Sequence, residues 1–197
     1  MPNWCDTDLV FKGPAKSLDA LVEQINTTRY MKSYVDHRAQ VNEWEVVSLL
    51  NAFLPRPADF KRVEDMTTWS PAQIDAATSA EVKEQMLKDN EACWRARAEL
   101  VEQIGTDDWY SWSVRNWGTK WPDESEAPLR RPRSVTMRLM TAWSSPVCGL
   151  ITISQMTGLS ISGRWYEAGM GVRGKYVIKA GELVEDQGWD YHGYRGG

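Results

Sequence analysis

One short segment of the chain combines residue types that suit ligand binding. It begins at Asn116 and ends at Trp121, and it places Trp117 and Trp121 on either side of a glycine, a hydroxyl and an ammonium group. Indole rings can stack on a planar ligand, with a gain of about 1–3 kcal/mol per stacked base. Lys120 can pair with a phosphate or carboxylate, while Asn116 and Thr119 can hydrogen-bond to polar edges. We therefore expect these five side chains to bind a nucleotide-like or otherwise anionic small molecule.

Two further segments carry candidate binding residues at expected strand ends or turns. Trp143 follows one predicted strand, whereas Tyr166 and Glu167 precede a glycine-rich run that contains Gly169 and Gly171. Rigid scaffolds commonly present binding groups at such places, and glycines let backbone amides approach an anion closely. We add these five residues to the predicted ligand-binding set. No residue is assigned as catalytic.

The glycine-rich run resembles nucleotide-binding motifs without their context. Residues 169–174 spell G-x-G-x-x-G, which in a dinucleotide site follows a strand and opens a helix, because the pyrophosphate lies at the helix N-terminus. Residues 175–178 instead have strand character. A P-loop also requires a serine or threonine for magnesium where this chain has Tyr176. The pattern therefore predicts a glycine-rich hairpin.

Histidine and cysteine usage argues against a metal centre. The two histidines, His37 and His192, are far apart in sequence, and the three cysteines, Cys5, Cys93 and Cys148, form no C-x-x-C pair. Metal sites normally show closely spaced ligands, and disulfide frameworks normally have an even number of cysteines. We predict no metal, no cofactor and reduced, mostly buried thiols.

Composition limits the class of protein. The chain has 197 residues, a net charge of −4, 25% charged and 42% hydrophobic residues, which suits one globular domain. No apolar stretch is long enough to span a membrane, and no signal peptide is visible, so we expect a cytoplasmic protein of the host cell without a membrane partner. A pI near 5.3 makes duplex nucleic acid an unfavourable partner. Eleven tryptophans against three phenylalanines indicate rings with a polar, solvated edge.

Hydrophobic periodicity predicts the elements of the first half. We expect a strand over residues 4–11, a helix capped by Ser17, a loop or short helix over 27–43 and a strand over 44–53. Ser70 and Pro71 predict a helix start, and residues 79–104 form the clearest helix, ended by Gly105.

The second half reads mainly as strands. We expect strands over 109–114, 134–141, 159–165 and 174–178 and near Leu183, an exposed loop over 122–133 and a helix over 147–157. The order predicts an α+β fold, an antiparallel sheet of ferredoxin-like plan with helices on one face. We expect a single domain over 1–187 with a helical insertion at about 70–105, and a glycine- and aromatic-rich tail over 188–197.

Four motifs resemble those of a known family. Residues 1–5, 116–121, 141–144 and 166–171 are similar to the Api-like (YubB-like) family of phage, plasmid and pathogenicity-island proteins. The chain departs from the family pattern at Pro122, which precedes Asp123, at Ser145, which replaces a proline, and at Val172, which replaces an aromatic residue. The resemblance implies a ferredoxin-like domain and a mobile-element origin, and it implies no established activity.

Several functions remain open at this point. The first is non-enzymatic binding of a nucleotide-like ligand that serves as a host-defence signal. The second is a protein-binding module that inhibits a host factor or forms a homo-oligomer, because exposed aromatic and arginine side chains are typical of interface hot spots. The third is an enzyme acting on nucleotides or nucleic acid through Lys120, Tyr166 and Glu167. Alternatively, the indoles only pack; if Trp117 binds a ligand or partner, Trp117→Ala is expected to abolish binding without unfolding the domain.

Overall fold

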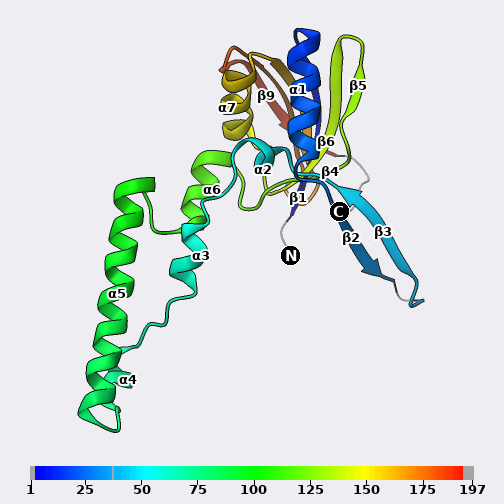
Figure 1. Ribbon diagram of the computed structural model, residues 1–197. Coiled ribbons are helices and arrows are strands. Elements are labelled where there is room, and N and C mark those ends of the chain that lie inside the picture. Colours follow the sequence, from blue (N-terminus) through cyan, green and yellow to red (C-terminus); the bar gives the residue numbers. More distant parts are fainter. Residues whose placement is uncertain (1–2, 37, 193–197) are drawn as a thin grey trace. The chain divides into compact units, whose positions relative to one another are not determined.

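The structure is a computed structural model that describes residues 3–36 and 38–192 (Figure 1). The chain divides into two compact units, one comprising Met1–Pro55 and Ser113–Gly197 and the other Arg56–Trp112. The predicted helical insertion at about 70–105 lies inside the second unit, which extends beyond it at both ends. Among the described residues, no helix is long and apolar enough to cross a membrane.

The first unit contains a seven-stranded sheet. Its main path runs β4-β6-β1-β7-β8-β9, with β5 also paired to β6, and every neighbouring pair is antiparallel. The strands are β1 (Trp4–Lys12), β4 (Glu124–Ser125), β5 (Leu129–Arg131), β6 (Ser134–Ala142), β7 (Ser160–Glu167), β8 (Val172–Lys179) and β9 (Glu182–Asp190). Because β1 lies between β6 and β7, these strands and the helix that joins β6 to β7 form a split β-α-β unit. The predicted α+β fold with an antiparallel sheet is confirmed.

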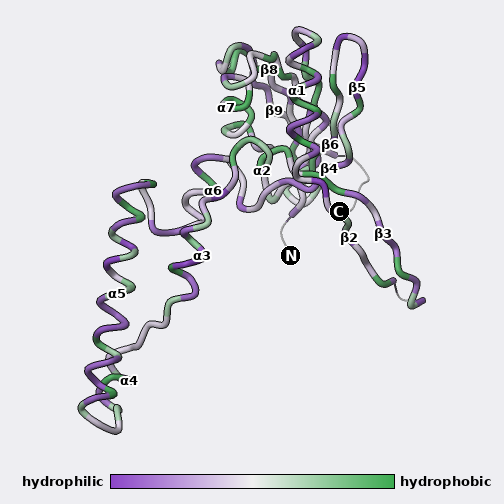
Figure 2. The backbone as a smooth tube through the Cα atoms, viewed as in Figure 1, coloured by the Kyte–Doolittle hydropathy of each residue, from purple (hydrophilic) through white to green (hydrophobic). Residues whose placement is uncertain are grey.

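The two faces of this sheet differ in burial. Along β1, Cys5, Leu9 and Phe11 are buried, whereas the alternate residues Asp6 and Asp8 are half-buried or exposed. The buried face packs against α1 (Ala15–Asn26) and α7 (Val147–Thr157), whose buried residues are mostly apolar. Figure 2 shows α7 as one of the more hydrophobic segments of the chain. We call the opposite face, with its half-buried or exposed side chains, the open face.

Most predicted elements of this unit are present. The strands expected at 4–11, 134–141, 159–165 and 174–178 and the helix expected at 147–157 are confirmed within one or two residues. The first helix begins at Ala15 after Pro14, so the prediction that Ser17 caps it is wrong. The expected short strand near Leu183 is the nine-residue β9. Its last residues, 188–190, were expected in the tail but pair with β8; residues 193–197 of that tail lie outside the described residues.

Residues 27–53 differ from the prediction. The expected loop or short helix contains β2 (Tyr30–Val35), and β3 (Val41–Val46) pairs with it as a separate two-stranded sheet. Nearly all of its side chains are exposed, so it lacks the buried alternating face by which a strand is recognised. The strand expected at 44–53 stops at Val46, and α2 (Leu49–Phe53) follows because Ser48 caps its N-terminus through the amide of Asn51.

The exposed loop expected at 122–133 is also wrong, since it contains β4 and β5 and one fully buried carboxylate. Asp123 accepts hydrogen bonds from the amides of Leu49 and Leu50 at 2.9 and 2.8 Å and from the hydroxyls of Ser48 and Ser125. Burial raises the pKa of Asp123, and these four hydrogen bonds oppose that rise. The carboxylate therefore joins the start of α2 to the β4 segment.

The second unit consists mainly of helices. It contains α3 (Asp59–Glu64), α4 (Pro71–Asp75) and α5 (Ala80–Ile104), and α6 (Trp109–Trp117) begins within it. The predicted helix start at Ser70 and Pro71 is confirmed as a capping box with Gln73. The predicted long helix is confirmed as α5, which Ser79 caps and Gly105 ends in a left-handed conformation.

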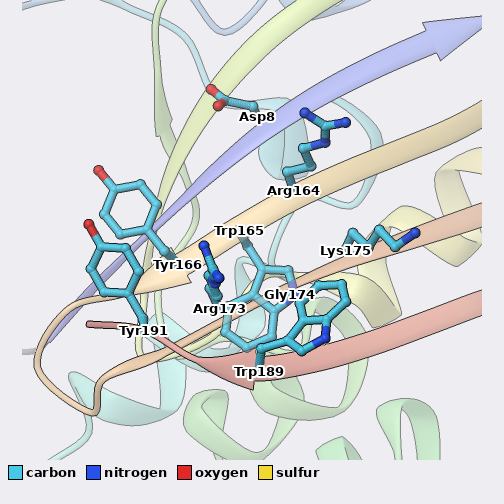
Figure 3. A pocket seen from close by; sticks show the side chains of 9 residues that line it. All are labelled: Asp8, Arg164, Trp165, Tyr166, Arg173, Gly174, Lys175, Trp189 and Tyr191. Carbon is cyan, nitrogen blue, oxygen red and sulfur yellow. The ribbon is translucent and has the colours of Figure 1, made fainter. Parts of the chain in front are cut away.

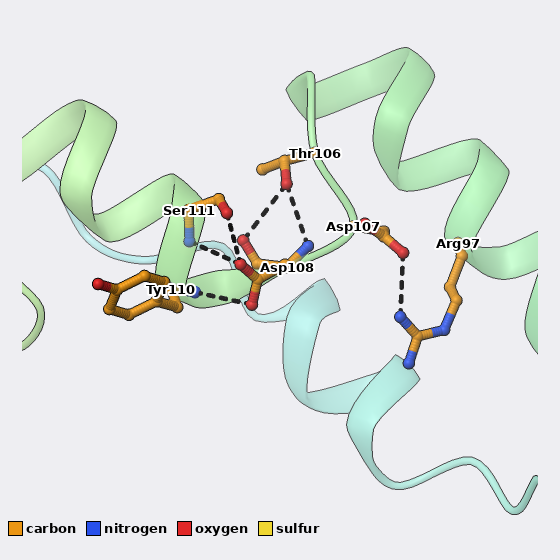
Figure 4. Close-up of polar contacts among 6 residues, drawn as sticks. All are labelled: Arg97, Thr106, Asp107, Asp108, Tyr110 and Ser111. Atoms are coloured by element: carbon orange, nitrogen blue, oxygen red, sulfur yellow. Dashed lines mark hydrogen bonds and ion pairs between the residues drawn. The ribbon is translucent and has the colours of Figure 1, made fainter.

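The prediction of a strand over residues 109–114 is wrong, because these residues form the first part of helix α6. The side chain of Asp108 accepts hydrogen bonds from the amides of Tyr110 and Ser111 and from the hydroxyl of Ser111 (Figure 4). This cap satisfies the unpaired amides of a helix start. Burial tends to raise the pKa of Asp108, but the hydrogen bonds from Ser111 and Tyr110 lower it overall. Aromatic and serine residues alternate here as they would in a strand, which explains the wrong prediction. The Asp108 cap stabilises the helix instead.

Candidate functional site

The predicted segment at residues 116–121 is largely occupied by contacts within the fold. Trp117 is 1% exposed, and its indole nitrogen donates to the carbonyl of Leu54 at 2.9 Å. The Thr119 hydroxyl, also buried, donates to the carbonyl of Ala142 at 2.8 Å. Asn116 is half-buried near the end of α6. Trp117 and Thr119 therefore hold the segment against the core, so we now expect Trp117→Ala to reduce stability.

The predicted residues after β7 form the turn that joins it to β8. Glu167 is buried, and its carboxylate accepts hydrogen bonds from the amides of Gly169 and Met170, both at 2.7 Å. Gly171 has φ +67°, and a Cβ on Gly169 would lie 2.4 Å from the side-chain nitrogen of Asn3. The chain's own carboxylate thus already takes the amides that were expected to approach an anion. The prediction of a glycine-rich hairpin is confirmed.

Three of the predicted residues do come together on the first unit. The ammonium of Lys120 lies 4.8 Å from the ring centre of Trp121 and 5.3 Å from that of Trp143, both within cation–π range. The rings of Trp121 and Trp4 are 6.4 Å apart. Trp143 is 45% exposed and has φ +70°, a conformation that costs backbone strain in a residue with a side chain. We call Trp4, Lys120, Trp121 and Trp143 the Trp–Lys cluster.

Tyr166 lies elsewhere, in a cleft of about 460 Å³ (Figure 3). A volume of this size is typical of small-molecule sites. We call it the open-face cleft, and its lining residues are Asp8, Arg164, Trp165, Tyr166, Arg173, Gly174, Lys175, Trp189 and Tyr191. Of the ten residues predicted from sequence, only Tyr166 lines this cleft.

Strand register places the polar and aromatic groups of the cleft side by side. Tyr166 of β7 pairs with Arg173 of β8, which pairs with Trp189 of β9. Arg164 pairs with Lys175 in the same way. Paired residues of antiparallel strands project from the same side of a sheet, so these side chains share the open face.

Two aromatic rings close one side of this arrangement. The rings of Tyr166 and Tyr191 have centres 5.3 Å apart and planes 31° apart. Figure 3 shows this pair on one side of Arg173 and the ring of Trp189 on the other. A cationic side chain thus lies between aromatic surfaces.

The cations around the cleft differ in how they are paired. Arg138 of β6 donates to Asp6 at 2.7 Å and to the Tyr166 hydroxyl at 3.3 Å, and the bond to Asp6 raises the pKa of Arg138. Lys175 forms an ion pair with Glu185 at 2.7 Å. Within residues 3–36 and 38–192, the guanidinium groups of Arg164 and Arg173 have neither an ion pair nor a hydrogen bond. Their charge is available to a ligand.

A sequence signal for this cleft existed in the strand alternation. Arg164 and Tyr166 are two residues apart, as are Arg173 and Lys175, so each pair falls on one face of its strand. The G-x-G-x-x-G pattern between these pairs led us to place the predicted ligand-binding residues in the turn instead. Gly174 serves packing, because a Cβ there would lie 2.7 Å from the ring of Trp165.

Three buried hydroxyl groups beneath the sheet, those of Thr7, Ser145 and Tyr176, form a chain of hydrogen bonds. The Thr7 hydroxyl donates to Ser145 at 3.1 Å, and Ser145 lies 2.8 Å from the Tyr176 hydroxyl. Burial raises the pKa of the neighbouring Cys5 thiol to about 12, and burial also raises the pKa of Tyr176. Cys5 is thus an unreactive thiol. Cys93 is buried as expected, whereas Cys148 is exposed.

The described part of the chain shows no group of three or more His, Cys, Asp or Glu residues that could hold a metal ion. The predicted enzyme residues lie in three different surroundings: Lys120 against indoles, Glu167 in a turn and Tyr166 in the open-face cleft. No nucleophile or acid–base pair among these three follows from the geometry.

A family model matches part of the second half of the chain. Residues 116–194 match the family model described as the ferredoxin-like domain in Api92-like protein. The crystal structure of a protein api92 from Yersinia pseudotuberculosis is similar at 10% sequence identity and a TM-score of 0.46, covering 98% of this chain and 100% of that one. No curated protein matches the chain. Over residues 116–194, the chain is thus similar to the ferredoxin-like domain of Api92-like proteins, in agreement with its antiparallel α+β sheet and with the resemblance to the Api-like family.

Proposed function

We propose that the protein binds a nucleotide-like ligand, an anion that carries a planar ring, in the open-face cleft and holds it without chemical change. The observation that carries this proposal is the pair of arginines, Arg164 and Arg173, which lack carboxylate partners in the described chain and lie beside aromatic rings. The cleft, and not the predicted segment at 116–121, is the proposed ligand site.

The chemistry of the lining residues matches such a ligand. Arginine presents a planar fork of donors that suits phosphate and carboxylate oxygens. The rings of Trp189 and Tyr191 offer flat surfaces on which a base can stack. Trp189 is 47% exposed, so a ligand can reach its ring without displacing the core.

Calorimetric titration with AMP, ADP and a cyclic dinucleotide tests this function. Inorganic phosphate and adenosine serve as probes for the two halves of the recognition. We expect heat with the nucleotides and weaker binding of each half alone. The double variant Arg164→Ala/Arg173→Ala should lose this binding. The control Arg131→Ala/Arg133→Ala removes the same charge from exposed positions around the β5–β6 turn and should retain it. Absence of heat with every nucleotide would refute the proposal.

The biological setting extends the same proposal. A phage or other mobile element would use such a protein, in the cytoplasm of its host, to sequester a nucleotide signal of host defence. The resemblance to the Api-like family motivates this setting. Loss of a signalling nucleotide from solution on adding the protein, with the nucleotide recovered unchanged after denaturation, is the expected result. Recovery of a converted product would indicate an enzyme instead.

The Trp–Lys cluster favours a second function, the binding of a host protein. Trp4 and Trp143 are 37% and 45% exposed, and clustered tryptophans are typical of interface hot spots. Pull-down from host lysate with the wild type and with Trp143→Ala tests it. A partner captured by both proteins equally would exclude the cluster as its binding surface.

A further inference from the structure

We infer that the ligand of the open-face cleft is a short single strand of nucleic acid that crosses the sheet, with the isolated nucleotide as its smallest part. This inference rests on the proposed function and names its ligand class. It follows from groups of the same chemistry that continue across the sheet beyond the cleft.

Strand register arranges the open face in two rows that run across the strands. The first row is Met140, Asp6, Tyr166, Arg173 and Trp189, on β6, β1, β7, β8 and β9 in turn. The second row, on the same strands, is Arg138, Asp8, Arg164, Lys175 and Gln187. Cations thus occur on three strands, β6, β7 and β8, while aromatic rings stand on β7 and β9.

The dimensions of these rows suit a chain of a few nucleotides. Neighbouring strands lie about 4.8 Å apart, so four steps from β6 to β9 span roughly 19 Å. Four-stranded sheets that bind single-stranded RNA stack about two or three bases on their open face. One nucleotide therefore occupies only part of the two rows.

The charge of this face differs from that of the whole chain. The protein has a net charge of −4, yet the two rows hold four cations, Arg138, Arg164, Arg173 and Lys175, against the carboxylates of Asp6 and Asp8 and that of Glu185, which pairs with Lys175 from β9. Local cations attract a phosphate backbone, and exposed rings take up bases. A duplex hides its base faces, so rings such as that of Trp189 favour a single strand.

Contact with Arg138 distinguishes a bound strand from a bound mononucleotide. It lies on β6, outside the lining of the open-face cleft, and its side chain is 44% exposed. Its bonds to Asp6 and to the Tyr166 hydroxyl hold it beside the first ring of the cleft. We therefore expect a bound strand to reach Arg138 and a single nucleotide to leave it uncontacted.

Measuring the affinity of the protein for thymidylate oligomers of one, two, three and six nucleotides tests the inference. Uridylate oligomers in a parallel series distinguish DNA from RNA, and a six-base-pair duplex is the third arm. We expect affinity to rise at least tenfold from one to three nucleotides and less than threefold from three to six. The salt dependence of log Kd should steepen with length, by about 0.7 per phosphate contacted.

Variants assign the expected gain to the rows. Arg138→Ala should weaken the trimer about three- to tenfold and the mononucleotide less than twofold, because Arg138 touches the cleft only through the Tyr166 hydroxyl. The exposed control Arg133→Ala should change neither. A mononucleotide that binds as tightly as the trimer, or a duplex that equals the single strand, overturns this inference and leaves the proposed function standing. No binding of any nucleotide or oligomer overturns both.

Discussion

Two aromatic and cationic regions of the first unit look alike in composition and differ in how their polar groups are used. Around residues 116–121 and 167–171, Trp117, Thr119 and Glu167 are bonded to backbone groups of the chain, and Lys120 lies over two indoles. In the open-face cleft, Arg164 and Arg173 have no such partner within the described residues. A segment rich in residue types that suit ligand binding can therefore serve to stabilise a turn. Unpaired charge on the face of a strand is the better indication of a ligand site.

The largest expected effect separates packing from binding at Trp117. Trp117→Ala removes a buried indole and its hydrogen bond to Leu54, so the free energy of unfolding should fall by about 3–5 kcal/mol. Urea denaturation followed by circular dichroism measures it, and the exposed Trp143→Ala serves as the control. A variant of wild-type stability that no longer binds nucleotides would return the ligand site to residues 116–121.

The next effect tests the cleft itself. Trp189→Ala removes one stacking surface at the sheet edge, so nucleotide affinity should fall by about 1–3 kcal/mol while the free energy of unfolding changes little. Titration calorimetry gives the affinity. Trp94→Ala, which removes a 70% exposed indole from the second unit, is the matched control. Equal affinities for the two variants would show that the cleft ring does not contact the ligand.

A smaller effect is expected at the turn. Glu167→Gln removes the negative charge from both hydrogen bonds and places a side-chain NH2 group, itself a donor, against one of the amides of Gly169 and Met170, so stability should fall by about 1–2 kcal/mol. Thermal unfolding checks this, with the exposed Glu182→Gln as a control. If Glu167→Gln instead kept full stability and lost nucleotide affinity, the carboxylate would belong to the ligand site.

The smallest effect concerns the Trp–Lys cluster. Lys120→Met keeps the length of the side chain and removes the ammonium from the rings of Trp121 and Trp143, which should cost about 0.5–1 kcal/mol of stability. Nucleotide affinity, measured by calorimetry, should stay within twofold of the wild type. Loss of binding here, with binding retained in Arg164→Ala/Arg173→Ala, would reverse the comparison between the two regions.

Much of the fold was predictable because its patterns are local. The alternation in β1, β6, β7 and β8, the capping box at Ser70 and the glycine that ends α5 each lie within one element. The errors arose where a distant residue decides. The carboxylate of Asp123 helps to start α2, although more than 70 residues separate the two. The hairpin of β2 and β3 lacked a signal because little of it is buried.

The amino-acid sequence by itself determined the α+β class, most strands and helices, and the positions at which arginines and aromatic residues share one strand face. Only the tertiary structure decided which of them have partners. The periodicity of a strand predicts the face on which each residue lies. The register between β7, β8 and β9 then places Tyr166, Arg173 and Trp189 in one row. The free energy of a polar group depends on whether the fold pairs it, and that pairing joins residues far apart in the chain.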